Sequence, residues 1–233
     1  MTTAIPQTSD ALARLENNPV RNELVSYLKA LKDDCGTLAR EQVLVILGQW
    51  FHPLHYFPTF LARLISVTSE LETQTFISRI LWQELGEGDP ANAHEKIYIS
   101  TINDGGFDSA HVASAAPTEA TAELVAGYAA ASADYLTGLG FLYGTEVVDL
   151  PMVATIGELM RRCTGKRNLP WVNIHVAQEP HHVDSSNETL KPTFSAAEQE
   201  RVVESAEQMW RLWINFFKSV RQAILPATQA QYN

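Results

Sequence analysis

The chain has 233 residues, of which 45% are hydrophobic and 19% are charged. This is enough apolar material for a sizeable core and too much for an intrinsically disordered chain. The formal net charge of −10 argues against partners whose phosphates need a basic stripe, so we expect neither nucleic acid nor an anionic membrane surface. Small molecules and proteins are the expected partners.

The cysteines and the N-terminus indicate the compartment. Cys35 and Cys163 lie far apart and outside any CxxC spacing, which predicts a reduced chain rather than a disulfide-bonded one. The polar N-terminal residues lack the basic region and apolar run of a signal peptide. No stretch approaches the roughly 18 apolar residues that a membrane helix needs. We therefore expect a soluble, cytoplasmic protein.

Almost every segment has helical periodicity, and no convincing alternating strand pattern occurs. The first predicted helical region covers residues 10–32, with a break or restart at Pro19. The second covers residues 40–65 and is rich in aromatic side chains. Pro53 and Pro58 lie inside it, and each removes a helix hydrogen bond, so we expect this helix to kink or to be interrupted.

The third predicted helix begins after Ser69, which is placed to cap it. It ends at the turn Gly86-Glu87-Gly88-Asp89-Pro90, where the glycines can adopt a left-handed cap. Asp89 and Pro90 then suit the start of the next helix, over residues 90–102.

The second half of the chain predicts a long helix over residues 118–143 that continues past Glu146. Gly138, Gly140 and Gly144 lie close together in it, where small residues would let another backbone approach. Pro151 is expected to begin a separate helix. Further helices are predicted over residues 170–182 and 195–224. No repeat or linker is evident, so we predict one all-α domain spanning residues 1–233.

Three histidines fall within eight residues, in His175-Val-Ala-Gln-Glu179-Pro-His-His182. At about 100° per residue, Glu179 lies about 40° from His175 and His182 about 20° to the other side, whereas His181 points elsewhere. Two imidazoles and a carboxylate on one face suit iron, manganese or zinc. Pro180 weakens the helix within this stretch. The alternative is a solvated polar face near a helix end.

A second candidate pair is Glu84 and His94. On one straight helix these residues would stand about 15 Å apart, too far to share an ion whose ligand bonds are about 2 Å long. The intervening turn at residues 86–90 removes this objection because it reverses the chain. The alternative is that Glu84 and Glu87 are surface charges at a helix end.

Glu146 is the third candidate, because it has apolar neighbours on both sides in Tyr143-Gly-Thr-Glu146-Val-Val. Burying such a carboxylate is costly without a cation or hydrogen bonds. A metal ion would satisfy it. The alternative is an amphipathic helix that presents one charge to water.

Taken together, Glu–x9–His, a lone Glu in a glycine-rich helix and His–x3–(Asp/Glu)–x2–His resemble the haem-oxygenase-like di-iron oxidases. The resemblance covers most of the chain and includes the Tyr56-Phe57-Pro58 stretch and the turn before His94. It implies an all-α, haem-oxygenase-like bundle of about seven helices around an iron pair. The ligands that it implies are Glu84, His94, Glu146, His175, Glu179 and His182. Glu179 stands where the family usually has Asp, and the longer side chain can change the metal position.

The ferritin-like di-iron proteins are the obvious competing family, because they use Glu-x-x-His pairs on two helices. Here Glu146 is followed at that offset by Asp149, and Glu84 by Glu87. The ferritin-like pattern is therefore absent.

The resemblance implies that two Fe(II) ions bind and reduce O₂ and that the resulting oxidant attacks a small molecule. Family members carry out N-oxygenation, oxidative C–C cleavage or nitrile-forming fragmentation, and we expect a substrate derived from an amino acid. The aromatic second helix, with Trp50, Phe51, His52, His55 and Tyr56, could line its pocket, and the residues that we expect to contact it are Phe51, His55, Tyr56 and Tyr143. The alternative is that these rings belong to the core. The resemblance also implies a homodimer.

Three other functions stay open. One is a metal-free enzyme of the same fold, like the thiaminase-II or pyrroloquinoline-quinone synthase types; a thiaminase-like reaction would want a cysteine such as Cys163 in the cavity. Another is a helical binding or adaptor protein, in which the acidic residues and histidines would be exposed and scattered. The last is a zinc or manganese hydrolase, which dependence on O₂ would separate from an oxidase.

Overall fold

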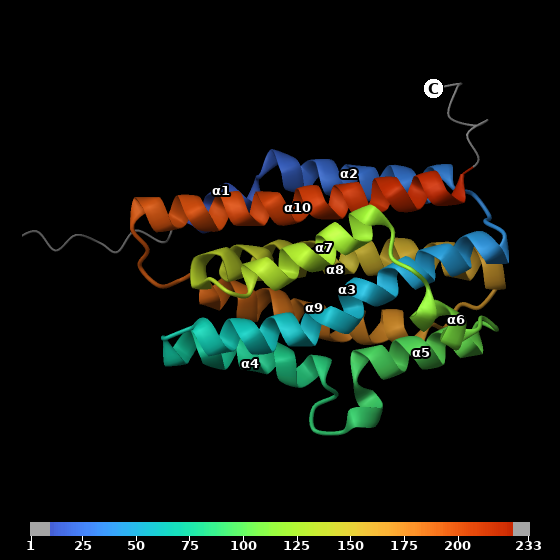
Figure 1. Ribbon diagram of the computed structural model, residues 1–233, viewed down its shortest axis with the longest axis horizontal. Helices are drawn as coiled ribbons and strands as arrows, with labels where there is room; N and C mark the ends of the chain where they lie inside the picture. The colour runs from blue at the N-terminus through green and yellow to red at the C-terminus, as the bar shows by residue number, and fades with distance from the viewer. Residues whose placement is uncertain (1–9, 226–233) are drawn as a thin grey trace, which may run out of the picture.

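The computed structural model describes residues 10–225, which form an all-α bundle (Figure 1). Within this range the chain forms ten α-helices and one 3₁₀ helix. They are α1 (Asp10–Glu16), α2 (Pro19–Asp34), α3 (Arg40–Val67), α4 (Leu71–Glu84), η1 (Pro90–Asn92), α5 (His94–Asp104), α6 (Ser109–Ser114), α7 (Glu119–Ala131), α8 (Tyr135–Thr164), α9 (Pro170–Thr189) and α10 (Ala196–Ile224). The all-α prediction is confirmed. The described residues form more than the expected seven or so helices, partly because short helices such as α1 and α6 are included.

The helix boundaries differ from the sequence predictions at several points. α3 continues through Pro53 and Pro58 without interruption. α8 likewise passes through Pro151, so no separate helix begins there. Buried packing along these long helices outweighs the local cost of each proline.

Two further differences concern the residues at which helices begin. The long helix predicted from residue 118 past Glu146 divides before Asp134, whose side chain accepts a hydrogen bond from the backbone N–H of Thr137 and so begins α8. The cap position of α4 is Glu70 rather than Ser69, and the Ser69 hydroxyl donates to the Glu70 carboxylate instead.

α8 is the central helix of the bundle. In Figure 1, α7 and α8 lie between a layer formed by α2 and α10 and a layer formed by α4, α5 and α9. α8 packs most extensively against α10 and α9. It contains an 18-residue window that is long and apolar enough to cross a membrane, which corrects the expectation from sequence. However, 72% of that window is buried inside the bundle, as befits a core helix.

Glycines on α8 allow α10 to approach closely. A Cβ added at Gly140 would lie 2.5 Å from the Val202 carbonyl oxygen and 2.6 Å from the Ser205 Cβ. One turn later, the Gly144 carbonyl accepts a hydrogen bond of 2.8 Å from the Trp210 indole. Gly140 and Gly144 therefore serve the close backbone approach that the glycine spacing predicts.

The turn between α4 and α5 brings two distant residues together. Gly86 has a φ of +90°, and a Cβ there would lie 2.2 Å from the Asp89 carbonyl oxygen, so only glycine fits. Asp89 caps η1 by accepting from the Ala91 N–H. The chain thus reverses between Glu84, the last residue of α4, and His94, the first residue of α5.

The close contact of α8 and α10 yields a stability prediction. Gly140→Ala should destabilise the protein by about 1–3 kcal/mol, because the added methyl meets backbone and Cβ atoms that cannot yield. Gly127→Ala on α7 is the matched control, since its Cβ would meet only side-chain atoms, the closest being Leu212 Cδ1 at 2.6 Å. Urea unfolding measures both, and equal stability of the two variants would contradict this account of the contact.

Candidate metal centre

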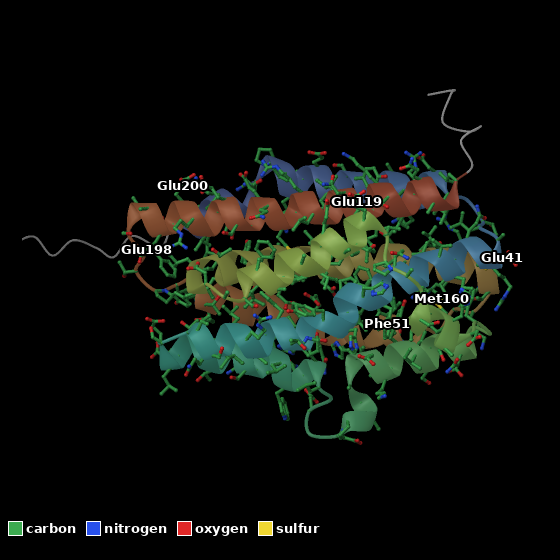
Figure 2. All side chains as sticks on the ribbon, viewed as in Figure 1. Glu41, Phe51, Glu119, Met160, Glu198 and Glu200 are labelled. Atoms are coloured by element: carbon green, nitrogen blue, oxygen red, sulfur yellow. The ribbon has the colours of Figure 1, made fainter. Side chains whose placement is uncertain are left out.

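The six residues predicted as metal ligands lie together on four helices. Glu84 ends α4, His94 begins α5, Glu146 lies in the middle of α8, and His175, Glu179 and His182 follow one another along α9. The Glu84 side chain is 10% exposed, and the other five residues are at most 5% exposed. Most acidic side chains behave differently: Glu41, Glu119, Glu198 and Glu200 lie at the surface (Figure 2).

Glu84 connects two of the histidines. Its Oε2 lies 3.1 Å from Nδ1 of His94, and its Oε1 lies 3.8 Å from Nδ1 of His182. His182 Nδ1 also lies 3.3 Å from Oε2 of Glu146. One ligand atom from each of Glu146, Glu179 and His182 falls within a group whose members are all within 4.8 Å of one another.

Hydrogen bonds from outside the cluster fix which nitrogen of two histidines faces it. His94 Nε2 lies 2.8 Å from Oε1 of Gln178, to which it donates, so Nδ1 faces Glu84. His175 Nδ1 lies 2.7 Å from the Trp171 carbonyl oxygen, to which it donates, so Nε2 faces the cluster. Such partners orient an imidazole for a metal and select its tautomer.

Gln178 is itself held by the turn between α4 and α5. Its amide nitrogen lies 3.4 Å from the carboxylate of Glu87, to which Gln83 also donates at 3.4 Å. Glu87 has a φ of 56°, in the left-handed region that non-glycine residues seldom adopt. The turn therefore places the Glu87 carboxylate where it accepts a hydrogen bond from Gln178, the partner of His94.

Burial and neighbouring charges separate the pKa values in the cluster. Burial of Glu84 opposes its ionisation, but the charge of His94 dominates and lowers the pKa of Glu84 to about 2. Burial similarly opposes protonation of His94, yet Glu84 raises its pKa to about 9. Burial, reinforced by the charge of His94, lowers the pKa of His175 to about 4, so His175 is neutral. Glu84 and His94 therefore form an ion pair. The neutral imidazole of His175 presents a lone pair.

The other carboxylates are hard to ionise together. Burial raises the pKa of Glu146, although His182 opposes this. Burial, followed by the charges of Asp149 and Glu146, raises the pKa of Glu179 well above its usual value. In the metal-free cluster, bound protons therefore compensate part of the buried negative charge. Metal binding would release these protons.

Asp149 is a member of the cluster that the predicted ligand set does not contain. It lies one turn after Glu146 on α8, and burial raises its pKa to about 6. Its Oδ2 is 3.8 Å from Nε2 of His175. The available signal was the three-residue spacing from Glu146, which places both side chains on one face of a helix.

A pocket opens directly on the cluster. Six acidic or histidine residues line one part of it and supply all its ionisable groups apart from Tyr128: Glu84, Glu146, Asp149, His175, Glu179 and His182. The remaining walls are mostly apolar and consist of Trp50, Pro53, Leu54, Phe57, Tyr128, Thr145 and Trp213. Tyr128 is buried, and its hydroxyl lies 2.7 Å from that of Thr145.

The four residues predicted to contact substrate do not line this pocket. His55 pairs with Glu95 at 2.8 Å and is exposed. Tyr56 accepts a hydrogen bond from Arg63. Phe51 stacks on His55.

The physical reason is the rotation of α3. Trp50, Pro53, Leu54 and Phe57 follow the i, i+3, i+4, i+7 pattern of one helix face, and that face borders the pocket. Residues next to them in the sequence point to other faces of α3, because each residue rotates the side-chain direction by about 100° around the helix axis. On α8, Tyr143 is buried near Arg21 and Glu16, on the side of α1 and α2. Of the aromatic residues considered on α3, Trp50 therefore lines the pocket, whereas Phe51 and Tyr56 do not.

The sequence matches the family described as "Iron-containing redox enzyme" over residues 45–214, a span that contains all seven residues of the cluster. The chain belongs to the iron-containing redox enzyme family. No curated protein shows significant similarity to it.

Solved structures show the fold of this iron-containing redox enzyme family member to be haem-oxygenase-like. A domain of unknown function with a heme oxygenase-like fold from Shewanella denitrificans has a TM-score of 0.65 at 20% identity, covering 91% of this chain and 88% of that chain. A CADD-like protein of unknown function from Nostoc punctiforme has a TM-score of 0.74 at 13% identity, covering 97% and 96%. A TenA homolog from Pseudomonas syringae pv. tomato has a TM-score of 0.71 at 12% identity, covering 95% and 98%.

The residues of the cluster fit iron. Imidazole and carboxylate are both suitable ligands for non-haem Fe(II). Several of their buried atoms have no hydrogen-bond partner among the described residues, which is costly unless a cation compensates them. These atoms are Oε1 of Glu146, Oδ2 of Asp149, Oε1 of Glu179 and Nε2 of His182.

The hydrogen bond from His94 to Gln178 yields a prediction about metal affinity. Gln178→Leu removes the acceptor that orients His94, so Fe(II) affinity should fall by roughly 10- to 100-fold. Gln199→Leu is the matched control, because Gln199 is a half-buried amide on α10 that donates to Phe194 far from the cluster. Anaerobic competition with a chromogenic chelator measures both affinities. Wild-type affinity in the Gln178 variant would contradict the orienting role.

Proposed function

We propose that this protein is an O₂-activating non-haem di-iron oxidase that acts on a small organic molecule. The observation that carries the proposal is the position of Glu84 between two histidines. Its two oxygens face His94 on α5 and His182 on α9 separately. A carboxylate in that position can bridge two ions, whereas a single ion would need only one of its sides.

The number of buried ligands also supports two ions. A protein usually supplies three or four ligands to one such ion, and the buried cluster offers six without Asp149. Glu146, Glu179 and His182 would hold one ion, because their ligand atoms lie within 4.8 Å of one another. His94 and His175, whose ring centroids are 4.8 Å apart, would hold the second. Glu84 would lie between the two.

When bound, an iron pair supplies the electrons that reduce O₂ and the oxidising power that acts on the substrate. The chain's own residues provide the surroundings. Trp50, Leu54 and Phe57 of α3 and Trp213 of α10 exclude water from the side of the pocket opposite the carboxylates. The Thr145 hydroxyl donates to the Phe141 carbonyl and so accepts from Tyr128, which holds that phenol against the pocket wall.

The walls of the pocket support a substrate with an apolar part and a polar end. Aromatic and aliphatic side chains would contact the apolar part. The Trp50 indole N–H is buried and has no acceptor among the described residues, so it is available to a substrate oxygen. An amino-acid-derived substrate combines these features, and it stays part of the proposal together with the expected homodimer.

Two observations disfavour the other functions. Neither Cys35 nor Cys163 lines the pocket, and both are free, so a cysteine nucleophile of the thiaminase type is not positioned for this site. An adaptor protein would expose the acidic residues and histidines, but here they converge and are buried.

The proposal is tested by anaerobic titration of the metal-free protein with Fe(II), followed by rapid mixing with O₂. We expect two irons per chain, a transient visible absorption band after mixing, and faster decay of that band with the correct substrate. Protein loaded with Zn(II) is the control and should consume no O₂. A single iron per chain, or catalysis that proceeds without O₂, would sink the di-iron oxidase and favour a metal-dependent hydrolase.

A further inference from the structure

Asp149 is a carboxylate within the cluster that the resemblance leaves without a role. It stands one turn after Glu146 in the middle of α8 and lines the pocket. Its side chain is 15% exposed, but its Oδ2 is buried and has no hydrogen-bond partner among the described residues. An uncompensated buried carboxylate oxygen needs a cation or a donor.

The atom that faces Asp149 cannot be that donor. His175 donates from Nδ1 to the Trp171 carbonyl, so in the neutral imidazole Nε2 carries a lone pair and no proton. This lone pair lies 3.8 Å from Oδ2 of Asp149. Two acceptors therefore face each other across a gap shorter than two metal–ligand bonds of about 2 Å each. One cation can contact both atoms.

This geometry also excludes a role for Asp149 in orienting His175. A carboxylate that positions a ligating histidine accepts a proton from the nitrogen that does not bind the metal. On His175 that nitrogen is Nδ1, and the Trp171 carbonyl already accepts from it. Asp149 instead faces the nitrogen that is available to a metal.

Charge balance supports the same conclusion. The buried cluster contains four carboxylates, those of Glu84, Glu146, Asp149 and Glu179, and three histidines, His94, His175 and His182. Two Fe(II) ions carry four positive charges, which the four carboxylates neutralise when the imidazoles are neutral. Without Asp149 one positive charge would stay uncompensated in a mostly apolar interior, which is unfavourable.

We propose that Asp149 is a further ligand of the metal pair and binds the same ion as His175. α8 then contributes a Glu-x-x-Asp pair, Glu146 and Asp149, in place of a single carboxylate. The assignment rests on the proposed di-iron function and deepens it.

The test compares Asp149→Asn with the wild type and with Glu158→Gln. Glu158 lies on the same helix, is paired with Arg162 and is outside the pocket, so it is a matched control. In anaerobic Fe(II) titrations, Asp149→Asn should bind the first ion as the wild type does and the second at least about tenfold more weakly. Mössbauer spectra of the loaded variant should change for one of two iron species. Glu158→Gln should match the wild type.

Metal-free stability gives a second readout. Asp149→Asn replaces a buried carboxyl group, whose ionisation the neighbouring carboxylates disfavour, with a neutral amide, so the metal-free variant should melt at or above the wild-type temperature. It should gain less from added Fe(II), because it binds the second ion less tightly. A metal-free Asp149→Asn variant that is unfolded or strongly destabilised would show that Asp149 is a structural residue and would overturn the assignment.

The failures are distinguishable. If the wild type binds two irons and Asp149→Asn binds both with unchanged affinity, the assignment of Asp149 is wrong and the di-iron function stands. If the wild type itself binds one iron or none, the di-iron function fails, and the assignment falls with it.

Discussion

The structure depends on one electrostatic constraint, the burial of several carboxylates and imidazoles inside an apolar helical bundle. Ionised carboxylates at this depth repel one another and lose their hydration, so the folded chain must supply compensating charge. In the metal-free cluster protons provide part of it, in the ion pair of Glu84 with His94 and on Glu179, whose pKa is raised by burial and by neighbouring carboxylates. Metal ions would replace these protons.

Two glycine positions bring the buried charged residues together. The glycine turn after Glu84 lets one short segment present both a carboxylate and an imidazole. Gly140 lets α10 pack closely on α8, which carries Glu146. The aromatic residues Trp50 and Trp213, whose ring centroids are 5.3 Å apart, close the apolar side of the pocket. All six candidate ligands lie within helices, on α4, α5, α8 and α9.

Much of this could be predicted from the sequence, because its strongest signals are local. The face shared by His175 and His182 follows from helical geometry, and the turn at Gly86 follows from glycine conformational freedom. The offset of Asp149 from Glu146 is visible in the sequence, but the ligand set implied by the resemblance contains only Glu146 from this helix. The separate helix predicted from Pro151 does not form, because tertiary packing carries α8 through that proline. The sequence could not select the pocket face of α3, since aromatic residues such as Phe51 and Phe57 surround that helix and periodicity alone cannot choose among them.

The most direct test of the central claim is anomalous X-ray diffraction at the iron absorption edge from crystals loaded anaerobically with Fe(II). The account predicts two anomalous peaks between α4, α5, α8 and α9. One should lie beside Glu146, Glu179 and His182, and the other beside His94 and His175. A single peak in the cluster, or iron bound only elsewhere on the protein, would contradict the claim that this bundle is built around a metal pair.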